Sequence, residues 1–107
     1  MTLEDLKKIS VFQTRTIAEI CKRSPETHAY IVECLHRFYE GDYGEICQED
    51  TAANNSELSY GCGHVLARYK AQYALESDIY IESHFDAEVD NTEIDYNNTM
   101  ICYCNER

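Results

Sequence analysis

The clearest pattern in the chain is a helical spacing of apolar residues after Ser24. Ile31, Cys34, Leu35 and Phe38 recur at intervals of three and four residues, which places them on one side of a helix. Ser24-Pro25-Glu26 supplies a capping side chain, a proline at the first helical position and an early acid, and Gly41 is a typical stop. The pattern therefore predicts a helix between Ser24 and Gly41.

Weaker helical signals lie on both sides of this segment. Thr2 followed by Asp5 resembles a capping box, so we expect a short helix from Leu3 to about Ile9. Residues 46–59 indicate a second main helix, which begins after the turn Asp42–Gly44 and ends before Gly61. Its expected buried side consists of Ile46, Ala53 and Leu58.

The second half of the chain changes from helical spacing to alternation. Segments rich in Val, Ile and Tyr predict strands, and the acidic segment between the last two is long enough for a wide hairpin loop. The expected strands are His64 to Tyr73, Asp78 to His84 and Thr99 to Cys104, and Val11 to Thr14 is a further short candidate. We therefore predict an α+β fold in which two main helices pack on a small three-stranded antiparallel sheet, in a single domain covering residues 1–107.

Composition narrows the classes of protein to consider. The chain has 107 residues, 44% of them hydrophobic, which is enough for one modest core. Its 20 acidic residues outnumber the 9 basic ones and give a net charge of −11, which disfavours direct binding to nucleic acid. No apolar run approaches the roughly 20 residues of a bilayer span, and the first residues lack the pattern of an export signal. We expect a cytoplasmic protein that binds neither nucleic acid nor a membrane.

The acidic residues are concentrated towards the end of the sequence. Residues 71–107 contain nine acidic side chains and one basic side chain, whereas residues 1–70 contain 11 and 8. Within this block the acids alternate with single apolar residues, which we expect to hold a loop against the core: Phe85, Val89, Ile94 and Tyr96. One interpretation is a solvated loop that only keeps the protein in solution. The other is a surface for a basic partner, formed by Asp86, Glu88, Asp90, Glu93 and Asp95.

Six cysteines are the second chemical feature. Without an export signal we expect a reducing compartment, where thiols stay free or bind metal and three disulfides are disfavoured. Cys62-Gly63-His64 and Cys102-Tyr103-Cys104 form two short pairs of the thiolate and imidazole type that suits tetrahedral Zn²⁺. We predict a structural zinc site at one end of the sheet, with Cys62, His64, Cys102 and Cys104 as ligands. Cys47, His36 and His84 remain alternative ligands, whereas Cys21 and Cys34 are expected in the core.

The common enzyme motifs are missing. The chain has no phosphate-binding Gly-Lys-Ser/Thr loop, no Gly-x-Gly-x-x-Gly, no His-Glu-x-x-His and no Gly-x-Ser-x-Gly. A cysteine activated by a histidine stays open, because such pairs meet in space and not in sequence. We expect a protein that is not an enzyme.

One stretch carries a family resemblance. Residues 34–44, Cys-Leu-His-Arg-Phe-Tyr-Glu-Gly-Asp-Tyr-Gly, are followed by Asp50 and Asn54 and then by Leu66-Ala67-Arg68-Tyr69. This order is similar to a family of small proteins from Firmicutes plasmids and prophages with an Arg-His-x-x-Gly-Asp-Trp-Gly signature. The chain departs from that pattern at Phe38, where the family has His, and at Tyr43, where it has Trp. We interpret the Gly-Asp-Tyr-Gly turn as structural, with Asp42 as a cap for the second helix.

The resemblance implies a mobile genetic element in a bacterial host cell. Small acidic proteins from such elements are often inhibitors of host defence, and anti-CRISPR proteins are similar in size and charge. The function we expect is therefore a non-enzymatic anti-CRISPR inhibitor that mimics the charge of DNA. It would bind the effector nuclease of a type II system through its acidic surface and block DNA loading. The alternative is a small zinc-stabilised accessory or regulatory protein with no nuclease target.

Overall fold

A computed structural model describes residues 1–107. The secondary structure comprises four α-helices, four strands and a short 3₁₀ helix at the C-terminus. In chain order these are α1 (Leu3–Leu6), β1 (Ser10–Gln13), α2 (Arg15–Arg23), α3 (Pro25–Tyr39), α4 (Gln48–Tyr60), β2 (Cys62–Tyr69), β3 (Ile79–Asp86), β4 (Asn98–Tyr103) and η1 (Cys104–Glu106). No helix combines the length and the apolar composition needed to cross a membrane.

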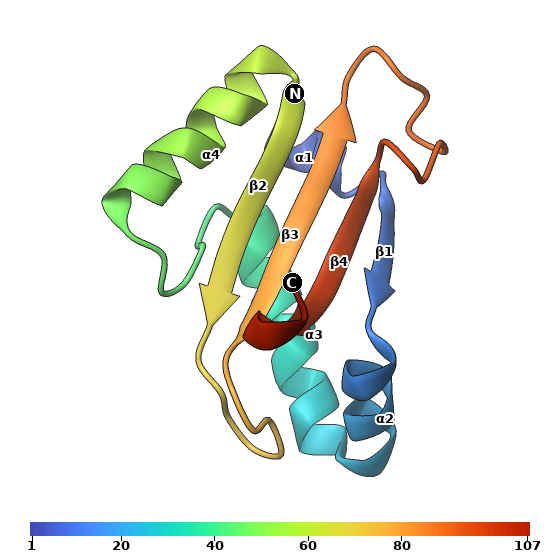
Figure 1. Cartoon of the computed structure of the whole chain (residues 1–107), viewed down its shortest axis with the longest axis vertical. Helices are drawn as coiled ribbons and strands as arrows, with labels where there is room; N and C mark the ends of the chain where they lie inside the picture. Colours follow the sequence, from blue (N-terminus) through green and yellow to red (C-terminus); the bar gives the residue numbers. More distant parts are fainter.

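The strands form one mixed sheet in the order β1-β4-β3-β2 (Figure 1). The two hairpin pairings are antiparallel, as predicted, but β1 adds a fourth strand that runs parallel to β4, with Ser10 opposite Asn98. The α+β class is confirmed, whereas the prediction of three antiparallel strands is wrong. The short strand near Val11 was expected, but its partner lies almost at the other end of the chain, where no local pattern could indicate it.

The helices cover one face of the sheet and leave the other open. In the view of Figure 1, α1 and α3 lie behind the sheet, α2 lies below the end of β1 and beside α3, and α4 lies beside β2. The predicted stripe of α3 is confirmed, because Ile31, Cys34 and Phe38 are buried in the core. The strands contribute their helix-facing residues to the same cluster: Val65, Ala67, Tyr69, Ile79, Ile81, Phe85, Ile101 and Tyr103.

Two parts of the helical layer differ from the expectation. α2 was not predicted, although Thr14 accepts a hydrogen bond from the Ile17 N–H and caps it, and Ile17 and Ile20 are buried. In the second main helix, α4, Leu58 is buried as expected but Ala53 is exposed. A polar residue, Asn54, takes the buried position instead, because its amide has a specific backbone partner.

The backbone partner of Asn54 is Leu66, on the outer edge of β2. We call this edge of the sheet the covered edge. The Asn54 side chain accepts a hydrogen bond from the Leu66 N–H at 3.0 Å and donates one to the Leu66 carbonyl at 2.8 Å. Two residues further on, the Arg68 N–H donates to the Tyr43 carbonyl and the Glu45 N–H donates to the Arg68 carbonyl. A side-chain amide and a loop thus take the place of a fifth strand.

The turn that supplies the loop is the Gly-Asp-Tyr-Gly signature. Tyr43 is buried and packs edge-on against Phe38. Gly44 has a φ of +71°, and a Cβ there would lie 2.0 Å from the Arg68 carbonyl oxygen. The prediction that Asp42 caps α4 is wrong, because the helix begins only after Cys47. Asp42 accepts hydrogen bonds from the Arg37 side chain at 2.7 Å and the Gly44 N–H at 3.1 Å, because the turn folds back on α3.

The opposite edge of the sheet is β1, which we call the open edge. All four of its residues, Ser10–Gln13, are exposed. No helix or loop forms a hydrogen bond with its outer side. The two edges of one sheet therefore differ: one is closed by two separate devices, and the other presents its backbone to solvent.

Candidate functional site

The predicted acidic surface lies on the loop between β3 and β4, at the end of the sheet where β4 and β1 begin (Figure 1). Asp86 ends β3 and is half-buried. Glu88, Asp90, Glu93 and Asp95 are all exposed. We call residues 86–96 the acidic loop. The five predicted partner-binding residues thus share one continuous segment at one end of the molecule.

A buried asparagine holds this loop in place from its C-terminal side. Asn97 is 1% exposed, accepts a hydrogen bond from the Asp86 N–H at 3.0 Å and donates one to the Asp90 carbonyl at 3.2 Å. The carboxylate of Asp90 in turn accepts hydrogen bonds from the N–H and hydroxyl of Thr92. The loop is therefore closed on itself by polar contacts, which fix the backbone that carries the acids.

Only part of the prediction for the apolar residues of this segment is confirmed, and Val89 is half-buried. Phe85 is buried, but Ile94 is 50% exposed and Tyr96 is 58% exposed. Asn97 already ties down this end of the loop, so the two side chains are free to face solvent. They stand among carboxylates, and apolar side chains within a charged rim are typical of the centre of a protein interface.

None of the five acids forms an ion pair within the protein. The salt bridges in the structure use other carboxylates, such as those of Asp42, Asp78 and Glu82. The Thr92 N–H and hydroxyl hold the pKa of Asp90 below its usual range. The charge of the acidic loop is therefore not neutralised by the protein's own cations and remains available to a basic partner.

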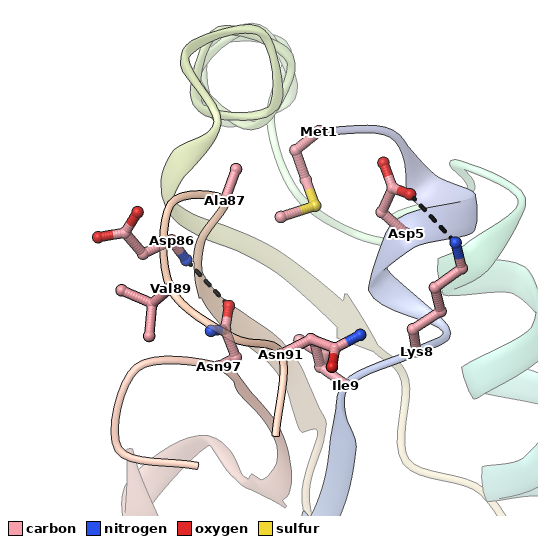
Figure 2. Close-up of a pocket in the computed structure, with 9 residues that line it drawn as sticks. All are labelled: Met1, Asp5, Lys8, Ile9, Asp86, Ala87, Val89, Asn91 and Asn97. Carbon is pink, nitrogen blue, oxygen red and sulfur yellow. Dashed lines mark hydrogen bonds and ion pairs between the residues drawn. The ribbon is translucent and has the colours of Figure 1, made fainter. Parts of the chain in front are cut away.

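A pocket of about 310 Å³ lies between the acidic loop and α1 (Figure 2). Asp86 and Asn97 line it on the loop side, and the Asp5–Lys8 ion pair lines it on the α1 side. The apolar part of the lining consists of Met1, Ile9, Ala87 and Val89. The pocket thus combines an apolar wall with the carboxylates of Asp5 and Asp86, of which only that of Asp5 is paired with a cation of the protein.

The residues predicted to bind zinc do not come together. Cys62 lies opposite Asp86 and His64 opposite His84, at the end of β3 next to the acidic loop. Cys102 lies opposite Tyr80, near the other end of β3, and Cys104 follows in η1. Four residues along a strand correspond to about 13 Å, and β2 and β4 lie on opposite sides of β3, about 10 Å apart.

This separation is too large for a shared ion. Zinc ligands lie about 2.0–2.3 Å from the metal, so all four must surround one point. No three His, Cys, Asp or Glu side chains are grouped closely enough to hold a metal ion. The pairing register, which the sequence does not reveal, therefore removes the geometric basis for a site made of Cys62, His64, Cys102 and Cys104.

The open face of the sheet holds a polar cluster that the sequence did not indicate. Glu82 is 8% exposed, and its carboxylate accepts a 2.6 Å hydrogen bond from the Arg107 guanidinium. His84 Nε2 lies 3.2 Å from the same carboxylate, and the His64 ring lies 5.7 Å from the His84 ring. Burial acts to raise the pKa of Glu82, but Arg107 and the two histidines outweigh it and hold that pKa below its usual range. The cluster thus keeps a nearly buried carboxylate ionised.

Four of the six thiols lie in surroundings that disfavour a reactive thiolate. All six cysteines are unpaired. Burial raises the pKa of the Cys21, Cys34, Cys102 and Cys104 thiols, which is opposite to the shift that activates a nucleophile. Cys34 lies in the core, as predicted, and Cys21 packs against its margin.

Comparison of the chain with known family models, with curated proteins and with solved structures found no match. The resemblance to a plasmid and prophage family therefore stays a prediction.

Proposed function

We propose that this protein is a non-enzymatic inhibitor from a mobile genetic element, which binds a nucleic-acid-processing enzyme of the host through its acidic loop. The target we propose is the effector nuclease of a type II CRISPR system, whose positively charged channel holds the guide and target strands. Occupying that channel would block the loading of DNA. The observation that carries the proposal is a loop of fixed shape with unpaired carboxylates and two exposed apolar side chains.

Two physical effects, charge steering and apolar burial, support this mode of binding. Acids without internal cations create a field that steers the protein into a basic groove and raises the association rate. Charge alone gives weak contacts in water, so a lasting complex also needs apolar burial. Ile94 and Tyr96 supply apolar surface beside the acids, and the pocket next to α1 can receive a lysine or arginine stem.

The test is a DNA cleavage assay with a guide-loaded type II effector nuclease, with and without the purified protein. Reversing Glu88, Glu93 and Asp95 to lysine, three loop acids whose carboxylates form no hydrogen bond within the protein, should abolish inhibition. The matched control reverses Glu33, Glu40 and Glu49, three exposed acids outside the loop that also lack ion pairs, and should retain it. The two triple variants carry the same net charge, so the comparison isolates the position of the acids.

Salt provides a second measurement on the same complex. Association of the wild-type protein should slow markedly as ionic strength rises, because exposed charges are screened beyond about 8 Å at physiological salt. Retained inhibition in the loop variant, or equal loss in both triple variants, would contradict the proposal. The Tyr96→Ser variant should bind with a similar association rate but dissociate faster.

A further inference from the structure

The open edge of the sheet carries an inference that is independent of the proposed function. The Thr14 N–H donates to the Ile101 carbonyl at 3.0 Å. In a parallel ladder the backbone groups of alternate residues point to the same side, so those of Phe12 also face β4. The N–H and C=O groups of Val11 and Gln13 therefore point away from the sheet. No backbone hydrogen bond outside the pairing of the strands involves Val11 or Gln13.

Apart from its length of four residues, this edge lacks the usual protection against pairing. Natural edge strands carry charged residues, prolines or bulges, or are covered by another segment. β1 has the sequence Ser-Val-Phe-Gln, without charge or proline, and all of its residues are paired with β4 in regular register. Val11 is 41% exposed and Phe12 is 39% exposed. The strand therefore offers both backbone groups and apolar surface to a further strand.

We propose that β1 pairs antiparallel with β1 of a second copy of this chain, centred on Phe12. In this register Val11 of each copy lies opposite Gln13 of the other, so that their outward N–H and C=O groups form hydrogen bonds in both directions. The two Phe12 residues then meet as a directly opposed pair without backbone hydrogen bonds, the arrangement in which side chains lie closest. The edge is self-complementary and forms one continuous sheet across two copies.

The distribution of charge favours a second copy as the occupant. The acidic loop lies at the end of the sheet where β1 begins, and α2 follows at the end where β1 finishes (Figure 1). α2 carries three exposed basic residues, Arg15, Lys22 and Arg23, and only one acid. Antiparallel pairing places the acidic loop of each copy at the same end as α2 of the other. Opposite charges are thus aligned across the interface, although each chain is strongly acidic.

The oligomeric state of the purified protein tests this inference directly. Sedimentation equilibrium over a range from micromolar to millimolar concentration should show a mass that rises from one chain to two. Higher salt should shift the equilibrium towards the single chain, because the aligned charges are exposed. A second experiment uses Val11→Pro, which removes an outward N–H and no ladder bond, and Val11→Lys, which places charge in the edge.

Both Val11 variants should remain single chains at every concentration. The matched control is Val32→Lys on α3, because Val32 is 40% exposed and differs from Val11 only in its place on the molecule. This control should dimerise like the wild type. Circular dichroism verifies that each variant is folded. A wild-type protein that stays a single chain up to millimolar concentration would overturn the inference, as would a dimer that both Val11 variants leave intact. Neither result bears on inhibition of the nuclease, which the loop variants test.

Discussion

The covered edge and the open edge of the sheet solve the same physical problem in opposite ways. Each edge strand has backbone N–H and C=O groups that its one neighbour does not satisfy. On β2, Asn54 and the turn at Tyr43 satisfy these groups within the chain. On β1, the groups of Val11 and Gln13 face solvent. The comparison indicates that a small protein can close one edge with buried polar contacts while leaving the other exposed to solvent.

The largest effect on stability is expected at Gly44, where the turn lies closest to the backbone of β2. Gly44→Ala places a methyl group 2.0 Å from the Arg68 carbonyl oxygen at a positive φ, so the turn must move away from β2. We expect the free energy of unfolding to fall by about 3 kcal/mol or more, measured by urea denaturation. Gly41→Ala is the control, since it has a similar φ of +85° but meets only a Leu3 methyl group at 3.3 Å. Equal losses in both variants would show that close approach to β2 is not the cause.

The second largest effect on stability is expected at Asn54, whose side-chain amide forms the hydrogen bonds that a neighbouring strand would form. Asn54→Leu keeps the branched shape of the side chain but leaves the N–H and C=O of Leu66 without partners, which should cost about 2–3 kcal/mol. Hydrogen exchange at the Leu66 amide should accelerate as well. Asn55→Leu, on the exposed side of the same helix, should change stability by less than about 0.5 kcal/mol. Unchanged exchange at Leu66 in the Asn54 variant would contradict the role assigned to the amide.

A smaller effect should make the covered edge sensitive to pH. The hydrogen bond with Arg37 holds the pKa of Asp42 below its usual value of 3.8. Since the folded state lowers this pKa, the ion pair stabilises the fold above that value and the contribution is lost as the pH falls through the folded pKa. The Asp42 side chain is half exposed, so the contribution is about 1 kcal/mol or less.

The variant Asp42→Asn should therefore be less stable than the wild type at neutral pH, and the difference should shrink in acid. Denaturation curves measured at a series of pH values would show this convergence. Glu40→Gln, at an exposed neighbouring acid without an ion pair, should show no such pattern. A difference that stays constant down to acidic pH would mean that Asp42 acts through its shape and not through its charge.

The smallest effect on stability is expected at the open edge. Val11→Lys removes no contact that closes the sheet, so it should change the free energy of unfolding of the single chain by less than about 0.5 kcal/mol. The measurement is made at low concentration, where dimers are absent. A loss of stability as large as that of the Asn54 variant would show that the Val11 side chain stabilises the single chain more than its exposure indicates.

Local patterns predicted much of this fold. The spacing in residues 25–39, the Thr2 capping box and the alternation in the last third all correspond to elements in the structure. The exposure of the four loop acids also followed from the sequence, because charged side chains rarely leave water without a partner. α2 could have been found as well, from the Thr14 cap, the pair Ile17 and Ile20, and two basic residues at its end.

The rest could not be read from the sequence, because it depends on which segments meet. Asn54 and Asn97 look like ordinary surface residues until their backbone partners are known. The two zinc-like pairs were plausible until the register separated them along β3. Glu82 becomes a nearly buried carboxylate only because Arg107, 25 residues later, returns to the same face of the sheet. These long-range contacts leave no periodic signal in either partner.

The parallel pairing of β1 with β4 also affects how the chain acquires its structure during synthesis. β1 leaves the ribosome early, but its partner begins only at Asn98. At about 5–20 residues per second, β1 must wait several seconds for β4. During that time both of its edges are unpaired, and its apolar side chains are exposed to other nascent chains. β1 therefore cannot join the sheet until β4 has been made, and completion of the sheet is limited by the synthesis of β4.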